Sequence, residues 1–352
     1  MQPQSTGISV RRYLFPANSL PSLGMPITRR TALVHGLAAT CLAGCGNPLK
    51  GSSESTIGLS FETLQTEYWE TSFRIFLQEL RKQGQAALEA VADGDASRQL
   101  DQVLAFIRRG ASGIIVAPKD STTAVPLVKH ANRAGVPIVF YNRPPAENAG
   151  RYTAVLADNA AIAETTVTHM AELARARGIR TQAMILLGDL GDMNAVGRRD
   201  GFDAALKPHA DAIEVVARVP TDWNQEKAQA GATAALAANP GINFIFSSSD
   251  FLFPSLVSAL RSVGKYHRIG HPEHVILGGF DGDSTAYRML VDGYLDADGV
   301  QDLYFECAES VAAILNFDSD RDAATLIRDE GFVAHQRNLD QLKTRMWGAS
   351  SA

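Results

Sequence analysis

Short apolar runs alternate with helical patterns along most of this 352-residue chain, and this alternation restricts its fold more than any other feature. Because strands that alternate with helices pack as parallel sheets covered on both faces, the sequence predicts an α/β fold. The first predicted series, in chain order, is strand Ile57–Phe61, helix Glu67–Gln83, a strand and a helix within 84–110, strand Gly113–Ala117, helix Ser121–Ala134 and strand Val136–Tyr141.

A second series of the same kind follows, joined to the first near Ala154–Asn159. Two such series predict two doubly wound, Rossmann-like lobes, each built on its own parallel sheet. The second series, in chain order, is helix 160–177, strand Ala183–Leu187, helix 195–206, strand 213–218, helix 224–238, strand Phe244–Phe246, helix 252–263, strand Val275–Gly278 and helix 284–292.

Composition excludes several classes of protein. A hydrophobic fraction of 45% supports a large core without a disulfide or structural metal. The formal net charge of -5 leaves no basic stripe to neutralise phosphates, which argues against a nucleic-acid partner. Of the three cysteines, only Cys307 lies in the predicted lobes, where a helical apolar pattern predicts a buried, inert thiol.

The N-terminus has the pattern of an export signal. Residues 1–45 contain four arginines and no acidic residue, and the apolar run Leu33–Gly44 is too short to span a bilayer. The run ends in Leu-Ala-Gly-Cys45, which resembles a bacterial lipoprotein signal and predicts lipidation of Cys45. Residues 46–55 predict a polar tether. Met1 or Met25 as the start, Sec or twin-arginine export, and the membrane that holds the anchor are alternatives that the sequence leaves open.

Polar and aromatic side chains come directly after the predicted strands. Ligands of open α/β sheets bind at the carboxyl ends of the strands, so we expect these side chains to meet around one ligand. Carboxylates, amides and guanidinium groups form paired bonds with sugar hydroxyls, and aromatic faces suit the apolar faces of sugar rings. The residues in these positions include Glu62, Thr66, Tyr68, Trp69, Asn142, Arg143, Asp192, Asn194, Arg198, Trp223, Ser249, Asp250 and Asp281.

Seven segments between about Ile57 and about Gln336 form a recognisable series: IGLSFETLQTEYW, VPIVFYNRPP, AVLADN, GDMNAVGRRDGF, TDWNQEKA, FSSSDFLFPSLVSALRSVGK and ILGGFDGDSTAYRMLVDGYLDADGVQ. Through these segments the chain resembles substrate-binding proteins of bacterial sugar ABC transporters, in the ribose/galactose type I group. Most are weak alone, but their order and spacing together are specific.

The resemblance implies roles for single residues. Tyr68, with Trp69 as the alternative on the same helix, matches the aromatic that stacks on the sugar from the N-terminal lobe, and Trp223 matches the one from the C-terminal lobe. We expect one of Tyr68 and Trp69 to face the ligand, since neighbours on a helix point apart. The positions that match hydroxyl-binding residues are Asn142, Arg143, Asp192, Asn194, Arg198, Asp281 and Gln301.

Several positions depart from the family pattern and leave the sugar undetermined. Ser249 stands where Asn is usual, and Glu62 stands where Ser or Tyr is frequent. Asp192 replaces the His of galactose-type proteins, and the calcium loop of that group has no counterpart at Arg175–Thr181. Each residue also has a structural alternative, such as core packing for Tyr68 and Trp69 or helix capping for Asp281.

The resemblance implies a type I periplasmic binding protein whose lobes are joined by a three-strand hinge, with crossings near Asp158, near Gln301 and near Arg328–Gly331. The expected lobes are 56–157 with 302–329, and 158–301 with 330–337; residues 338–352 are expected to form a tail. The expected function is capture of a monosaccharide or polyol by hinge closure and delivery to an ABC permease, by a monomer without a cofactor.

Two other functions remain as alternatives. The same fold presents ligand to a chemoreceptor or a sensor kinase, and the sequence does not separate sensing from transport. An exported sugar-acting α/β enzyme would need a nucleophile–base pair or a metal set, and the sequence indicates neither. His267, His271 and His274 form a cluster before a predicted strand, where an exposed loop is expected rather than a metal site.

Overall fold

The computed structural model describes residues 55–146, 149–178, 180–318 and 324–351. The predicted signal at 1–45 with Cys45, and nearly all of the tether, lie outside the described residues. Across the described ranges no helix is both long and apolar enough to cross a bilayer. The predicted alternation is confirmed: each strand and helix of both series is present, with bounds that differ by a few residues.

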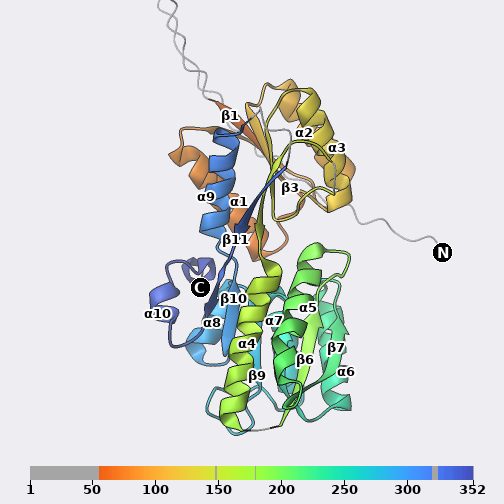
Figure 1. Cartoon of the computed structure of the whole chain (residues 1–352), viewed down its shortest axis with the longest axis vertical. Coiled ribbons are helices and arrows are strands. Elements are labelled where there is room, and N and C mark those ends of the chain that lie inside the picture. The colour runs from red at the N-terminus through yellow and green to blue at the C-terminus, as the bar shows by residue number, and fades with distance from the viewer. Residues whose placement is uncertain (1–54, 147–148, 179, 319–323, 352) are drawn as a thin grey trace, which may run out of the picture. The chain divides into compact units, whose positions relative to one another are not determined.

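The first sheet is fully parallel, with strand order β11-β5-β4-β3-β1-β2. Helices α1 and α9 pack beside each other on one face and α2 and α3 on the other (Figure 1). The elements are β1 Thr56–Phe61, α1 Glu67–Lys82, β2 Ala86–Val91, α2 Ala96–Arg108, β3 Gly113–Ala117, α3 Ser121–Arg133, β4 Ile138–Tyr141, β5 Thr153–Ala157, α9 Leu303–Leu315 and β11 Thr325–Asp329.

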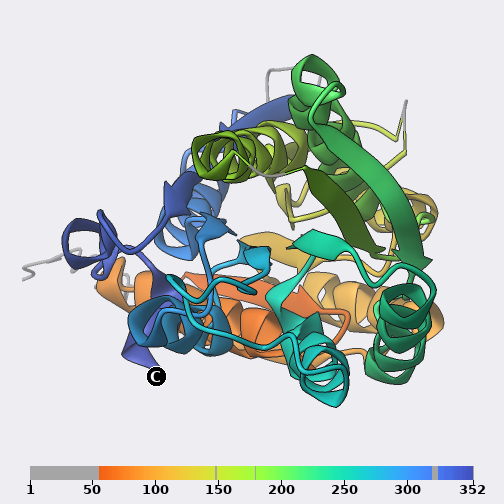
Figure 2. The same cartoon turned by 90° about the horizontal axis from the view of Figure 1, so that it is seen from below.

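The second sheet has the order β12-β10-β9-β8-β6-β7 and is parallel except for β12, which runs antiparallel to β10. Figure 2 shows this sheet with α4 on one side and α6 on the other. Its elements are α4 Asn159–Arg177, β6 Thr181–Leu187, α5 Met193–Leu206, β7 Ile213–Pro220, α6 Gln225–Ala238, β8 Ile242–Ser247, α7 Phe253–Ser262, β9 Ile276–Asp281, α8 Ser284–Asp292, β10 Ala297–Val300 and β12 Phe332–Ala334.

The chain passes between the sheets three times. It leaves β5 through Asp158 into α4, leaves β10 through Gln301 into α9, and leaves β11 through Gly331 into β12. These passages lie at the predicted crossing positions, and the fold is the predicted two-lobed α/β architecture. The lobe boundaries given above stay a prediction.

Buried apolar strands hold each lobe together and place polar loops at the strand ends. All five residues of β3 and all six of β9 are buried, as expected for strands covered on both faces. In the first lobe the Phe61 ring lies edge-on to Trp69 and Phe76 and stacks with Tyr141, with each pair of ring centroids 5.9 Å apart. This aromatic packing fixes the carboxyl ends of β1 and β4, from which Glu62 and Arg143 project.

Residues 338–351, predicted as a tail, form structure of their own. Helix α10 spans Leu339–Leu342, and the 3₁₀ helix η3 spans Trp347–Ser350. Trp347 is fully buried. Residues 338–351 have no periodic pattern, and long-range contacts described below hold the segment in place.

Candidate functional site

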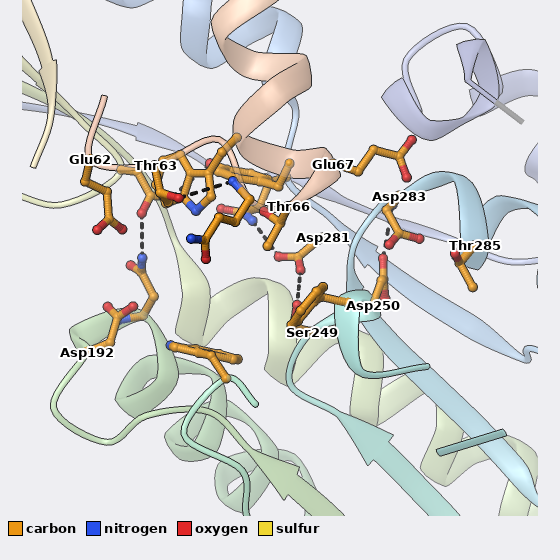
Figure 3. Close-up of a pocket in the computed structure, with 18 of the residues that line it drawn as sticks. Glu62, Thr63, Thr66, Glu67, Asp192, Ser249, Asp250, Asp281, Asp283 and Thr285 are labelled. Atoms are coloured by element: carbon orange, nitrogen blue, oxygen red, sulfur yellow. Dashed lines mark hydrogen bonds between the residues drawn. The ribbon is translucent and has the colours of Figure 1, made fainter. Parts of the chain in front are cut away.

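A cavity of about 560 Å³ lies where loops from the carboxyl ends of both sheets face each other. Figure 3 shows Glu62, Thr63 and Glu67 of the first lobe opposite Asp192 and Ser249 of the second. The structure brings all twelve predicted sugar-binding residues to this one cavity: Glu62, Tyr68, Trp69, Asn142, Arg143, Asp192, Asn194, Arg198, Trp223, Ser249, Asp281 and Gln301.

Arg143 lies between two carboxylates from different lobes. Its Nη1 donates to Glu62 Oε1 at 2.8 Å, and its Nη2 donates to Asp192 Oδ2 at 2.9 Å. The three side chains are only 10–14% exposed. The guanidinium carbon also lies 5.2 Å from the centre of the Trp69 ring, so an aromatic face completes its surroundings.

The two carboxylates that share Arg143 differ in acidity. Burial raises the pKa of Glu62 above its ordinary value, and Arg143 offsets this only in part. Burial acts on Asp192 in the same direction, but Arg143 and the Asn194 backbone N–H outweigh it and lower the pKa of Asp192. Asp192 is therefore the firmly ionised partner, and it belongs to the opposite lobe from Arg143.

A chain of hydrogen bonds between side chains crosses the cavity. Asn142 Nδ2 donates to the Tyr68 hydroxyl at 2.8 Å, and Asn142 Oδ1 accepts from Asn194 Nδ2 at 2.8 Å. Asn194 Oδ1 accepts from Asn159 Nδ2 at 3.0 Å, and Asn159 Oδ1 accepts from Arg198 Nε at 2.7 Å. The chain orients each amide, so the polar edges around the cavity have fixed directions.

Asp281 is the centre of the polar groups in the second lobe. Its Oδ1 pairs with Arg198 Nη1 at 2.9 Å and accepts from Gln301 Nε2 at 2.8 Å. Its Oδ2 accepts from the Ser249 hydroxyl at 2.5 Å, which Figure 3 shows as a dashed line. Ser249, which departs from the family pattern, thus binds Asp281 directly.

Asp250 binds the backbone of the loop that carries Asp281. It is fully buried, and its carboxylate accepts from the backbone N–H groups of Phe280, Gly282 and Asp283 at 2.7–3.1 Å. Burial, followed by nearby Asp298, raises the pKa of Asp250 well above its ordinary range. The loop it holds includes Asp281 at a φ of 132°, a conformation that L-residues rarely adopt.

All three tryptophans of the chain border the cavity: Trp69, Trp223 and Trp347. Trp223 and the preceding Asp222 have φ values of 54° and 50°, so the loop after β7 is strained where it presents the indole. A Cβ atom at Gly188 would lie 2.1 Å from the Trp223 ring, so only glycine leaves room for the indole there.

Both Tyr68 and Trp69 border the cavity, although we expected only one of them to do so. Their rings are perpendicular, with centroids 5.0 Å apart, in the first turn of α1. At the end of a helix neighbouring side chains can both reach a facing cavity, which a rule for helix interiors does not anticipate. Both rings also belong to the hydrophobic core. Core packing and a position at the cavity, given above as alternatives, therefore apply to the same two residues.

Some buried polar atoms at the cavity have no protein partner within the described ranges. They are Trp223 Nε1, Gln301 Oε1 and Glu67 Oε1. Because an unpaired buried polar group costs about 1–3 kcal/mol, these atoms favour a ligand that both donates and accepts hydrogen bonds. A polyhydroxylated ligand does both.

Sequence reasoning missed several residues of the cavity. Asp283 and Glu67 follow the strand-end pattern and could have been included on that basis. Trp347 carried no signal, because it lies beyond the last predicted element. The other lining residues that the sequence did not indicate are Thr63, Gln65, Gly94, Gln225, Phe251, Pro254 and Thr285. Thr66 and Asp250, which follow predicted strands, line the cavity as well.

The three histidines of the predicted cluster do not lie together in the structure. His274 is buried and bonds Asp296 Oδ2 at 2.8 Å, whereas His267 and His271 stack with ring centroids 3.9 Å apart. Glu273 joins these two in a group whose ligand atoms lie within 4.8 Å of one another. However, His267 Nε2 bonds the Gly264 carbonyl and His271 Nδ1 accepts the Glu273 N–H, so one nitrogen of each ring is already engaged. The loop precedes β9, at the end of that strand opposite to Asp281.

Comparison with known proteins gives a family and a set of relatives. Residues 57–317 match the family model of the periplasmic binding protein domain. The ribose import binding protein of Bacillus subtilis is 27% identical over 69% of this chain and 75% of its own length. The D-apiose import binding protein of Actinobacillus succinogenes is 26% identical over 66% of this chain and 72% of its own.

Solved structures share the fold. A periplasmic solute-binding protein of an ABC transporter from Actinobacillus succinogenes, with bound D-allose, superposes with a TM-score of 0.74. It is 23% identical and covers 82% of this chain and 100% of its own. A Bacillus halodurans solute-binding protein with bound myo-inositol has a TM-score of 0.70 at 24% identity, over 84% of this chain and 99% of its own.

Proposed function

The chain belongs to the periplasmic binding protein family, and we propose that its cavity captures one monosaccharide or polyol molecule for an ABC transporter. It is a solute-binding protein and not an enzyme. The observation that carries the proposal is the composition of the cavity, where paired carboxylate, amide and guanidinium groups stand among three indoles. Sugars and polyols need this mixture, because they combine hydroxyl groups with apolar C–H faces.

The proposed mechanism is closure of the two lobes around the ligand. Arg143–Asp192 and Asn142–Asn194 are direct contacts between side chains of opposite lobes, and Glu67 Oε2 accepts from the Ser284 hydroxyl at 2.7 Å as a third. In the closed form each ligand hydroxyl must find a partner, since water no longer reaches it. That requirement gives the site its selectivity among stereoisomers.

We assign roles within this proposal by position. Asp281, Arg198 and Gln301 form one polar cluster, and Glu62, Arg143 and Asp192 form another. Each cluster offers both donors and acceptors to hydroxyl groups. Trp223 is assigned to one apolar face of the sugar ring, with Trp69 and Tyr68 on the side of the first lobe.

Export and anchoring are part of the proposal and rest on the sequence. The basic, acid-free segment 1–45 and the Leu-Ala-Gly-Cys45 ending support a lipoprotein, anchored through lipidated Cys45 and a short tether. Fractionation of cells that express the full chain tests this: Cys45→Ser is expected to move the protein from the membrane fraction to the soluble fraction. Retention of the variant in the membrane fraction would remove the lipid anchor from the proposal.

A thermal-shift screen of the purified chain tests the binding function. Pentoses, hexoses, polyols and inositols are the probes, and a true ligand at a hundredfold excess over Kd stabilises the native state by about 2.7 kcal/mol. We expect one stereoisomer to raise the melting temperature, and Asp281→Asn or Trp223→Ala to abolish that shift. Asp200→Asn, at an exposed ion pair with Arg199, is the control and should respond like wild type. Folded, ligand-free protein that responds to none of the probes would contradict sugar and polyol binding.

A further inference from the structure

The segment from α10 to η3 packs against the cavity, and it lies outside the residues that match the family model. Trp347, at the start of η3, borders the cavity yet has 0% of its surface exposed. Its indole is therefore packed among protein atoms within the wall of the cavity.

Trp347 contacts both lobes. Its Nε1 donates to the backbone carbonyl of Asp281 at 2.9 Å, next to the carboxylate that binds Arg198 and Gln301. Its ring lies edge-on to Tyr68 of the first lobe, with centroids 6.1 Å apart. One side chain thus supports two residues that face the cavity from opposite lobes.

The backbone of the segment is fixed beside Trp347. The Gly348 N–H donates to the Gly282 carbonyl at 3.0 Å. A Cβ atom at Gly348 would lie 2.2–2.3 Å from backbone atoms of Asp283, so the two backbones approach as closely as glycine permits. Arg345 Nη2 pairs with Asp302 Oδ2 at 2.7 Å, and its guanidinium lies 4.4 Å from the centre of the Phe332 ring. These contacts fix the backbone on both sides of the indole.

We propose that Trp347 is a specificity-determining residue that limits the length of the ligand and positions Asp281. This rests on the proposed sugar or polyol binding. The fixed ring sets how far the cavity extends on the side of Asp281. A ligand with a bulky substituent pointing toward Asp281 meets the part of the wall that the indole supports and is excluded.

The test compares the wild-type full chain with Trp347→Phe, Trp347→Leu and Trp347→Ala, and uses Thr344→Ala, at an exposed position of the same segment, as the control. Calorimetric titrations measure the affinity for the single-ring sugar found in the screen and for its methyl, phenyl and benzyl glycosides. Melting temperatures of the free proteins show which variants are folded. Free indole is then added to the smaller variants, because an apolar cavity left by a removed ring can bind an aromatic molecule.

We expect Trp347→Phe to weaken binding of the single-ring sugar about threefold to tenfold, through loss of the hydrogen bond to Asp281. Trp347→Leu and Trp347→Ala should weaken it more, gain measurable binding of an aryl glycoside, and recover sugar affinity when indole is added. A residue that only stabilises the fold would lower affinity for all ligands alike.

Wild-type affinity and unchanged discrimination in every folded variant, Trp347→Phe included, would overturn the inference. Loss of sugar binding without any gain of an aryl glycoside and without rescue by indole would overturn it as well. If the wild type binds no sugar or polyol, the proposed function itself fails and the inference fails with it. If the wild type binds a sugar but the Trp347 variants discriminate between that sugar and its glycosides as the wild type does, only the role of Trp347 is removed.

Discussion

Arg143 and Asp192 belong to loops of different sheets, yet Arg143 Nη2 and Asp192 Oδ2 lie 2.9 Å apart with both side chains almost fully buried. Because Glu62 pairs with the same guanidinium within the first lobe, Arg143 keeps one partner when the lobes separate. In the proposed closure mechanism, we therefore expect the contact with Asp192 to break when the lobes separate and to form again when they close.

Asp192→Asn is expected to weaken ligand binding by about tenfold to a hundredfold, or about 1.4–2.8 kcal/mol. Asn keeps an oxygen that can accept from the Asn194 N–H at the start of α5, so the helix cap survives while the charge is lost. Calorimetric titration with the ligand from the screen measures the effect. Asp203→Asn, which breaks a pair with Arg218 whose side chains are about 40% exposed, should leave affinity unchanged. Equal effects of the two substitutions would argue against a role for the contact between lobes.

Gly188→Ala should weaken ligand binding with little loss of stability. The new Cβ would meet the Trp223 ring at 2.1 Å, and the indole on its exposed loop can move aside more easily than a core residue. Gly191→Ala in the same loop is the matched control, since its Cβ would lie 3.2 Å from Asp189 Oδ1 and far from the indole. Affinity and melting temperature are measured for both. Wild-type affinity in Gly188→Ala would show that the position of Trp223 does not matter for binding.

Asp283 should make the protein less stable as the pH rises from about 4 to 7. Burial, with contributions from Glu67 and Asp281, raises its pKa to about 7, whereas the unfolded chain has a value near 3.9. In this window the folded state keeps a proton that the unfolded state has lost, so the free energy of unfolding falls with rising pH. Asp283→Asn retains the oxygen that accepts from the Ala286 N–H and removes the titration. Urea unfolding should show the variant equal to wild type near pH 4 and more stable at pH 7, by up to about 4 kcal/mol.

The control for this pH effect has the opposite sign. Asp95 caps α2, and the N–H groups of Arg98 and Ser97 lower its pKa. A lowered pKa adds stability above about pH 4, which is lost as the pH falls, so Asp95→Asn should be less stable than wild type at pH 7. A stability difference between Asp283→Asn and wild type that stays constant from pH 4 to 7 would contradict the titration of Asp283.

Tryptophan emission should report ligand binding directly, because all three tryptophans border the cavity. A ligand that replaces water beside Trp223 should change the emission of the wild-type protein in a saturable way. Trp223→Phe should reduce the amplitude of this change while retaining an aromatic face, and hence most of the affinity. A signal of the same amplitude in Trp223→Phe would place its source at Trp69 or Trp347 instead.

The sequence predicted the fold and most of the cavity because both depend on local patterns. Apolar runs mark where buried strands end, and the residues that follow, such as Asn142 and Asp192, are positioned by the end of the strand. Gln301 was predicted from the family resemblance instead. Ser249 and Asp281 were identified from the ends of their strands. Their mutual hydrogen bond was not predicted, since it depends on the register of β8 beside β9.

Trp347 could not be found in this way. Its position depends on the close approach of Gly348 to Asp283 and on the pair of Arg345 with Asp302, which join segments far apart in the chain. No periodic pattern within 338–351 encodes such contacts. Tyr68 and Trp69 show a similar limit, because the first turn of α1 lets both rings reach the cavity.

The strained backbone at Asp222 and Trp223 has a consequence for protein engineering. Two consecutive residues with positive φ raise the energy of the native state by about 1–3 kcal/mol each, and glycine would relieve that strain at either position. Screening variants for heat resistance alone would therefore favour loss of Trp223. Such a screen would yield a more heat-resistant protein that has lost an indole from its ligand cavity. Engineering for stability should therefore retain selection for ligand affinity.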